Sequence, residues 1–239
     1  MKLLDLTLPT LAENLALDDA ILEDAEKSER PVEVLRFWES PRIAVVIGRS
    51  SRVNDEVNVP FCRQEGIPIL RRCSGGTAVV IGPGCFMYGV VLDCRSRPHL
   101  RMVDQAHHFV LSQLRQAIQS LGVQVHFEEP CDLTLEDRKI SGNSLRCKRQ
   151  SLLYHGTVLY AFPNDWIASC LRFPPRQPAY RHDRSHAEFV VNAPVLVDRL
   201  RESLTATWQV VETLDEWPRQ ETERLALERY SRDEWTFRI

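Results

Sequence analysis

The order of the strand-like and helix-like segments constrains the fold of this chain most. Runs rich in β-branched and aromatic residues, a composition typical of strands, occupy residues 3–8, 32–38, 42–47, 67–72, 78–81, 86–92, 123–127, 132–136, 139–146 and 152–160. Helical periodicity occupies residues 11–29, 54–65, 99–121, 192–208 and 219–230. Because strands follow strands without a steady βαβ alternation, the sequence predicts an α+β fold and not a doubly wound parallel sheet.

Several segment ends are also predicted. The helix over residues 99–121 places Val103, Ala106 and Val110 on one face and stops at Gly122. Gly66 is expected to end the shorter helix over residues 54–65. Residues 82–84, Gly-Pro-Gly, are expected to join the strands on either side of them as a pair. A length of 239 residues fits one large domain, so we predict a single domain over residues 1–239.

Composition disfavours several function classes. The net charge of −3 argues against a general nucleic-acid coat. The longest apolar runs, such as residues 43–47, fall far short of the ~20 residues that cross a bilayer. Seven cysteines are an odd number and include no Cys-x-x-Cys pair, which is typical of reduced thiols in a cytoplasm. We therefore expect a cytoplasmic protein that binds neither nucleic acid nor membrane.

The first segment that suggests chemistry is a basic strand end followed by a turn of small residues. Residues 71–79 read Arg-Arg-Cys-Ser-Gly-Gly-Thr-Ala-Val. Glycines let a backbone approach a ligand closely, and successive amides in such a turn form an anion-binding nest. Arginines beside the turn suit phosphate or carboxylate recognition. An ordinary surface hairpin with two solvated arginines fits the pattern equally well.

Two further segments carry polar residues inside strand patterns. Residues 132–144 predict a hairpin whose return strand carries Lys139 ahead of Ser-Gly-Asn. That lysine can place its ammonium against a phosphate or carbonyl oxygen, but it also suits an edge strand, where lysine discourages aggregation. His155 interrupts the apolar strand over residues 152–160 and needs a polar partner. On its own, it is more typical of a structural histidine than of a catalyst.

Taken in order, the three segments resemble the lipoate–protein ligase A family, within the biotin and lipoyl protein ligase catalytic domains. They read Arg-Arg-x-Ser-Gly-Gly, then Asp-Leu…Arg-Lys-Ile-Ser-Gly-Asn, then His-Gly-Thr-x-Leu. The resemblance extends to residues 14–18, Asn-Leu-Ala-Leu-Asp, and covers roughly residues 5–165. The lysine segment is its most specific part.

The resemblance implies a class II synthetase-like catalytic domain, in which helices flank a mixed central β-sheet, and it implies an enzyme. Ligases of this kind condense lipoate (or octanoate) with ATP and Mg²⁺ to an acyl-AMP, and then transfer the acyl group to a lysine of a carrier. The implied carriers are the lipoyl domains of 2-oxoacid dehydrogenases or the H protein of glycine cleavage. Lys139 would contact the carboxyl and α-phosphate oxygens, and Arg71 would hold phosphate. The other implied binding residues are Ser74, Gly75, Gly76, Thr77, Asp132, Gly142, Asn143, His155 and Gly156.

The sequence departs from the family pattern in two places. Ligases of this family commonly have a third glycine where Thr77 stands, and a histidine where Ile81-Gly82 follows. Longer ligases also carry a C-terminal accessory domain, and little sequence after Trp208 is left to build one. We therefore expect no accessory domain in this chain, and adenylation that either depends on a separate accessory subunit or does not occur.

Two alternatives of different chemistry stay open. An octanoyltransferase of the same fold would carry the acyl group on a cysteine thioester, and Cys131 and Cys147 both have basic neighbours that favour a thiolate. Neither cysteine matches the position used by a known transferase class. A non-catalytic lipoyl-binding protein is the third hypothesis, and the intact Lys139 segment disfavours it.

Two other charged patterns each fit two interpretations. His182 and His186 have a spacing that suits a metal on one helix face, but Ser185 and Glu188 equally predict a capping box that would leave His182 outside the helix. We predict no metal site. A basic region would either steer an acidic carrier domain or form a solvated strand face. It comprises Arg138, Lys139, Arg146, Lys148 and Arg149.

Overall fold

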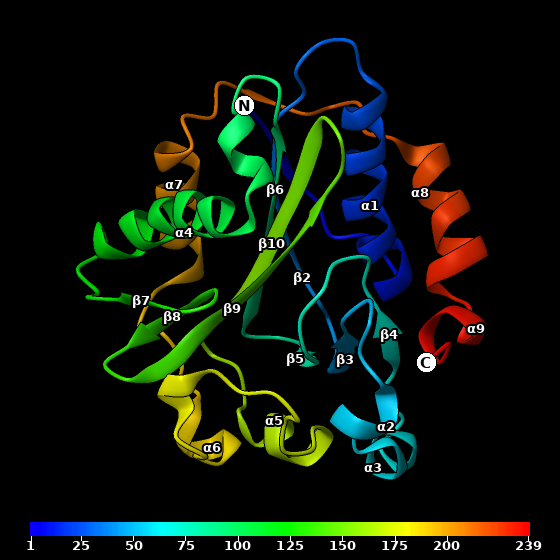
Figure 1. Cartoon of the computed structure of the whole chain (residues 1–239), viewed down its shortest axis with the longest axis vertical. Coiled ribbons are helices and arrows are strands. Elements are labelled where there is room, and N and C mark those ends of the chain that lie inside the picture. The colour runs from blue at the N-terminus through cyan, green and yellow to red at the C-terminus, as the bar shows by residue number, and fades with distance from the viewer.

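A mixed sheet of eight strands forms the centre of the computed structural model, which describes residues 1–239 (Figure 1). In spatial order its strands are β11 (Glu212–Thr213), β1 (Lys2–Asp5), β2 (Val34–Glu39), β6 (Cys85–Asp93), β10 (Ser151–Leu159), β9 (Arg138–Cys147), β8 (Asp132–Leu135) and β7 (His126–Glu128). Strand β1 runs parallel to β2 and β11, and all other neighbours are antiparallel. The predicted mixed sheet is confirmed.

A second sheet has three strands in the order β4 (Ile69–Arg71), β3 (Ala44–Ile47) and β5 (Val79–Ile81). The prediction that β5 pairs with β6 is wrong. Strand β5 pairs with β3 instead, because both edges of β6 are already occupied by β2 and β10. Residues 82–84 therefore connect two sheets.

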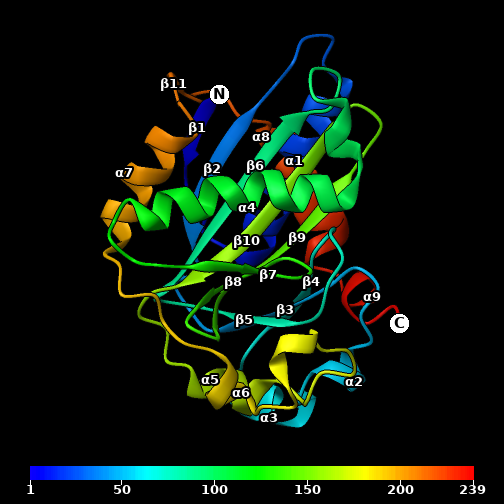
Figure 2. The same cartoon turned by 60° about the vertical axis from the view of Figure 1, so that its left-hand side comes forward.

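Helices cover the two faces of the large sheet. Helices α4 (Val103–Gln119) and α7 (Val197–Thr207) pack on one face, while α1 (Leu11–Lys27) and α8 (Arg219–Leu225) lie with the small sheet on the other (Figures 1 and 2). Each face has its own apolar core. The predicted inner face of α4 is buried at Ala106 and Val110, whereas Val103 is 54% exposed at the helix start.

The remaining helices are short. They are α2 (Val53–Glu56), α3 (Val59–Gln64), α5 (Asp165–Cys170), α6 (His186–Phe189) and α9 (Asp233–Thr236). The single helix predicted over residues 54–65 is wrong: it divides at Val57, and Asn58 caps α3. Pro60 has no N–H for the helix ladder and its ring would clash with the carbonyl four residues earlier, which accounts for the break.

The helix predicted to start at Asn192 begins only at Val197. The Asn192 side chain is engaged elsewhere: its Oδ1 accepts from the Phe162 amide (3.0 Å) and its Nδ2 donates to the Phe162 carbonyl (2.9 Å). The capping box at Ser185 is confirmed, so His182 lies outside α6. All seven cysteines are free. No helix combines the length and apolarity that a membrane crossing requires.

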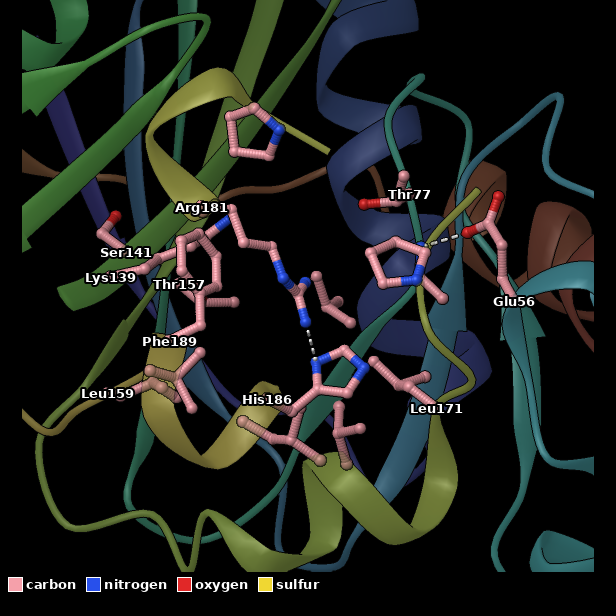
Figure 3. Close-up of a pocket in the computed structure, with 18 of the residues that line it drawn as sticks. Glu56, Thr77, Lys139, Ser141, Thr157, Leu159, Leu171, Arg181, His186 and Phe189 are labelled. Atoms are coloured by element: carbon pink, nitrogen blue, oxygen red, sulfur yellow. Dashed lines mark hydrogen bonds between the residues drawn. The ribbon is translucent and has the colours of Figure 1, made fainter. Parts of the chain in front are cut away.

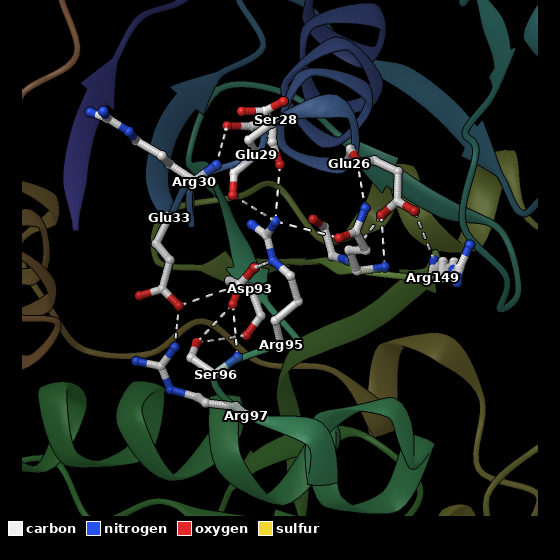
Figure 4. Close-up of polar contacts among 12 residues, drawn as sticks. Glu26, Ser28, Glu29, Arg30, Glu33, Asp93, Arg95, Ser96, Arg97 and Arg149 are labelled. Carbon is white, nitrogen blue, oxygen red and sulfur yellow. Dashed lines mark hydrogen bonds and ion pairs between the residues drawn. The ribbon is translucent and has the colours of Figure 1, made fainter.

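A polar network fastens the end of α1 to the end of β6 (Figure 4). Arg95 pairs with Asp93 (Nε to Oδ1, 2.6 Å) and also donates to the Ser28 carbonyl (3.0 Å). Burial alone raises the pKa of Asp93, but hydrogen bonds from Ser96 and Arg95 outweigh it and hold that pKa below its ordinary value. The Glu26 carboxylate accepts three backbone amides of the β9–β10 turn.

Strands β9 and β10 meet at a position that only glycine can occupy. A Cβ on Gly156 would stand 1.8 Å from Oδ1 of Asn143. The Asn143 amide cannot retreat, because Oδ1 accepts from the Tyr88 hydroxyl (2.6 Å) and Nδ2 donates to the Cys131 carbonyl (2.8 Å).

Replacing Gly156 with alanine is therefore expected to destabilise the protein by about 3 kcal/mol, since the new methyl group must displace a bonded amide. Urea unfolding followed by circular dichroism measures this. Gly75→Ala is the matched control, because a Cβ there meets no atom within 4 Å. Equal stability of the two variants would contradict the role given to Gly156.

Candidate active site

Two cavities adjoin between the large sheet, the small sheet and the segment that follows α5. The first, which we call the α1 cleft, has a volume of about 1230 Å³ and is bounded by Leu15 and Asp18 of α1. The second, the loop chamber, has a volume of about 800 Å³ and is bounded by residues 171–190. Both volumes include the open mouths.

The α1 cleft combines an apolar part with a polar end. Its apolar side chains are Leu15, Trp38, Val46, Val79 and Met87. Its polar side chains include Asp18, Arg72, Asp132, Lys139, Asn143, Ser144, His155 and Arg176. This arrangement suits a hydrocarbon chain that ends in an anionic group.

The loop chamber is the more cationic of the two cavities. Arg172, Arg176 and Arg181 enter it from the loop, together with Lys139 from β9. Arg181 meets His186 inside the chamber (Nη2 to Nδ1, 3.4 Å; Figure 3). Burial lowers the pKa of His186, which favours its neutral form. Apolar walls and several cations suit a ligand with a flat apolar part and phosphates.

Lys139 lies where the cavities meet. The residues that line both are Thr77, Val79, Lys139, Gly142, Thr157, Arg176 and Pro178. The Lys139 ammonium pairs with Asp132 (Nζ to Oδ1, 2.8 Å), and its side chain runs over Gly142, where a Cβ would stand 2.9 Å from Nζ. Asp132 is buried, whereas the Lys139 side chain remains 26% exposed. A ligand can therefore reach this ammonium from either cavity.

Arg71 does not reach either cavity, which corrects its predicted role as a phosphate ligand. Its guanidinium is fully buried and donates to backbone carbonyls alone, at distances of 2.7 to 3.0 Å. These carbonyls belong to Gly48, Arg49, Ser51, Trp235 and Thr236. Each of the three guanidinium nitrogens thus has a backbone partner, and Arg71 joins the loop after β3 to the C-terminal segment.

Arg72 is the arginine that lines the α1 cleft, but its guanidinium is also hydrogen-bonded to backbone carbonyls. It donates to the carbonyls of Val46, Gly75 and Thr77. Burial lowers its pKa to about 10, so it stays charged at neutral pH. The carbonyl of Gly76 points toward Gly48, where a Cβ would stand only 1.9 Å from it. Of the predicted turn residues, Gly76 and Thr77 line the cavities, whereas Ser74 and Gly75 support the turn.

His155 has two polar partners, as predicted for a histidine in an apolar strand. Its Nδ1 lies 3.0 Å from the Asp18 carboxylate, and its Nε2 lies 2.6 Å from the Ser74 hydroxyl. Because a carboxylate only accepts, Nδ1 donates to Asp18. Burial raises the pKa of Asp18, but its contacts with Arg36 and His155 outweigh this and lower the pKa. The chain of contacts fixes the Gly-rich turn to α1 and β10.

The two cysteines considered as nucleophiles lie in unfavourable surroundings. Cys131 lines the α1 cleft, but burial and the neighbouring Asp132 raise its pKa to about 11. Cys147 lines neither cavity, and burial raises its pKa as well. Neither thiol is therefore a thiolate at neutral pH.

Sequence reasoning missed the arginines of the loop chamber. Arg176 lies in the Pro-rich stretch over residues 173–178, Arg172 and Arg181 lie beside it, and none of the three was among the predicted site residues. The predicted basic region is largely neutralised, because Lys148 pairs with Glu23 and Arg146 lies 3.9 Å from Asp19.

Comparison with known proteins identifies the family. The model of the lipoyl protein ligase A/B catalytic domain matches residues 10–211. The chain belongs to this family. The predicted resemblance is confirmed, and so is the prediction of an enzyme.

Relatives within the family include proteins of two named activities. A putative lipoate-protein ligase A from Aeropyrum pernix is 29% identical over 85% of this chain and 72% of its own length. The octanoyltransferase LipM of Geobacillus kaustophilus is 24% identical over 94% of this chain and 93% of its own length. The chain spans only 41% of a putative lipoate-protein ligase A from Schizosaccharomyces pombe.

A solved structure of the family shares the whole architecture. A bi-partite lipoate protein ligase from Thermoplasma acidophilum superposes with a TM-score of 0.83, at 24% identity, over 99% of this chain and 95% of its own. The fold of the family is therefore present throughout the chain.

Substituting Arg71 with methionine is expected to destabilise the protein by about 3 kcal/mol or more, because five buried carbonyls lose their donor. Thermal and urea unfolding measure the loss. Arg63→Met is the control, since the Arg63 side chain is exposed on α3 and makes no hydrogen bond. A stable Arg71→Met protein that had lost only ligand affinity would restore the phosphate-binding role.

Proposed function

We propose that the protein is a lipoate–protein ligase, which activates lipoate or octanoate with ATP and transfers the acyl group to a lysine of a lipoyl carrier domain. One observation carries this proposal: Lys139 is shared by an apolar cleft and an arginine-lined chamber. The cleft suits the acyl chain and the chamber suits the nucleotide, so the two reacting groups meet at Lys139.

Activation joins the acyl carboxylate to the α-phosphate. A carboxylate oxygen attacks the α-phosphorus of ATP, the bond from that phosphorus to the bridging oxygen breaks, and pyrophosphate leaves. Negative charge grows on the α-phosphate oxygens during attack. A preorganised cationic donor at this point is typically worth roughly 10²–10³ in rate, and Lys139 is placed to supply it.

Transfer uses the same position. The neutral amine of the carrier lysine attacks the acyl carbonyl, AMP leaves with the electrons of the broken acyl–oxygen bond, and the nitrogen releases one proton to solvent as the amide forms. Lys139 stabilises the oxyanion of the intermediate and the departing phosphate oxygen. Gly142, beneath the Lys139 stem, leaves room for the Lys139 side chain, because a Cβ there would stand 2.8 Å from Cε and 2.9 Å from Nζ.

Mg²⁺ enters this reaction as part of the substrate MgATP. Magnesium usually keeps several waters and binds through substrate phosphates with one or two carboxylates. The carboxylates that line the two cavities are Asp18, Glu56 and Asp132.

The carriers we propose are the lipoyl domains of 2-oxoacid dehydrogenases or the H protein of glycine cleavage. The T. acidophilum ligase is described as bi-partite and was studied with its E2 lipoyl domain. By analogy, a separate accessory subunit is a candidate partner here, and a single catalytic domain over residues 1–239 remains our prediction. The seven free cysteines support a cytoplasmic location.

Octanoyl transfer through a cysteine is the second candidate function. The similarity to LipM over nearly the full length of both chains favours it. The raised pKa values of Cys131 and Cys147 count against it, because the thiolate is the nucleophile.

Lys139→Met should lower the rate of acyl-AMP formation from ATP and lipoate by about 100-fold or more, because the donor at the α-phosphate is lost. Radiolabelled pyrophosphate exchange measures this half-reaction. Lys148→Met is the matched control, since Lys148 pairs with Glu23 and lines neither cavity. Full exchange activity in Lys139→Met would remove the basis of the proposal.

The double variant Cys131→Ser, Cys147→Ser should keep its ATP-dependent activity, because no thioester forms in a ligase. Mass spectrometry of an acceptor lipoyl domain, supplied with either lipoate plus ATP or octanoyl carrier protein without ATP, separates the two functions. ATP-independent transfer that disappears in the double variant would establish the transferase instead.

A further inference from the structure

Tyr180 reaches the same carboxylate that holds Lys139. The Tyr180 hydroxyl donates to Oδ2 of Asp132 (2.8 Å), while Lys139 pairs with Oδ1 (2.8 Å). Asp132 is 4% exposed, so it has little water to replace either partner. Burial and the nearby Asp132 raise the pKa of Tyr180, which keeps its hydroxyl protonated.

The segment that carries Tyr180, residues 172–185, forms one wall of both cavities. Arg176 and Pro178 line both, and Arg172 and Arg181 line the loop chamber. Arg184 fastens this segment to the β8–β9 turn: it donates to the Tyr180 carbonyl (2.8 Å) and pairs with Asp137 (2.9 Å). Tyr180 is thus held to the β8–β9 hairpin through both its backbone and its side chain.

We propose that Tyr180 is a positioning residue for Lys139, acting through Asp132, and that it links the placement of the 172–185 segment to the orientation of the ammonium. This inference rests on the proposed function. An ammonium has three donors. Asp132 takes one of them, which leaves two for the carboxyl and α-phosphate oxygens of the ligands.

The link works because the Asp132 side chain has two oxygens with separate partners. The Tyr180 hydroxyl fixes the rotation of the carboxylate about its Cβ–Cγ bond, and the rotation fixes where Oδ1 meets Lys139. Without the hydroxyl, the carboxylate turns and the ammonium spends less time between the two cavities. The ring of Tyr180 keeps its place, because it packs on Phe189 with ring centroids 5.2 Å apart.

Tyr180→Phe tests this link, since it removes one hydroxyl and keeps the ring. We expect kcat for acyl-AMP formation to fall about tenfold, the usual effect of losing a hydrogen bond to a charged group, with little change in KM for ATP or lipoate. In an Asp132→Ala background the same substitution should have no further effect on kcat, because its route to Lys139 is already gone.

Tyr160→Phe is the matched control. The Tyr160 hydroxyl also donates to a carboxylate, Oε2 of Glu39 (3.0 Å), and Tyr160 lines neither cavity. It should leave kcat unchanged. A Tyr180→Phe protein as active as Tyr160→Phe would overturn the proposal, and so would an equal loss of kcat with and without Asp132.

Hydrogen exchange of residues 176–185 gives a readout that does not depend on activity. Tyr180→Phe and Asp132→Ala should each accelerate exchange in this segment, and the double variant should exchange no faster than Asp132→Ala. If the wild-type protein forms no acyl-AMP, the proposed function fails. The hydrogen-exchange measurement alone then decides whether Tyr180 holds the 172–185 segment through Asp132. Unchanged hydrogen exchange in Tyr180→Phe would overturn the role proposed for Tyr180.

Discussion

Two buried guanidinium groups hold the Gly-rich turn on which both cavities depend: Arg72 bonds the turn directly, and Arg71 bonds the loop after β3, whose Ser51 hydroxyl donates to the Gly76 carbonyl. Arg71 ties the loop after β3 to the C-terminal segment, and Arg72 ties β3 to the carbonyls on either side of the turn. Burying a charged group is costly unless its donors are satisfied. Backbone carbonyls satisfy them here, so the turn cannot change its shape without exposing several unpaired groups. The ligand walls are thereby preorganised.

The residues that stabilise the turn are therefore different from the residues that can contact a ligand. The arginines of the Gly-rich segment are occupied by backbone, and the positive charge available to a ligand comes from Lys139 and from the 172–185 segment. The turn supplies shape, and the loop and β9 supply charge. Because the loop is fastened to the β8–β9 hairpin, the two sources of charge are placed relative to one another by local contacts.

The sequence predicted most strand positions and the hairpin that carries Asp132 and Lys139, because hairpin pairing is local and follows from the pattern of residues. The family resemblance implied the mixed sheet. The phosphate-binding role was assigned to Arg71, whereas Arg72 is the arginine that lines the cleft. Adjacent residues of an extended segment point to opposite sides, so a choice between Arg71 and Arg72 needs the burial of each face. The pairing of β5 likewise depended on which sheet edge was free. The arginines at 172, 176 and 181 gave no periodic signal, since tertiary contacts alone bring their loop over Lys139.

The same cavities also bear on how the acyl group is activated. A thioester route requires a thiolate beside the acyl carbonyl, and Cys131 stands at the right cavity but beside Asp132, which disfavours a second negative charge. Burial is the main reason that the pKa of the Cys131 thiol is raised, and the carboxylate that positions Lys139 raises it further. A route through acyl-AMP has no such conflict, because AMP is the leaving group and no thiolate is needed. Its main requirement is a fixed cation beside the phosphate. In this geometry, the support given to Lys139 favours adenylation over a cysteine nucleophile.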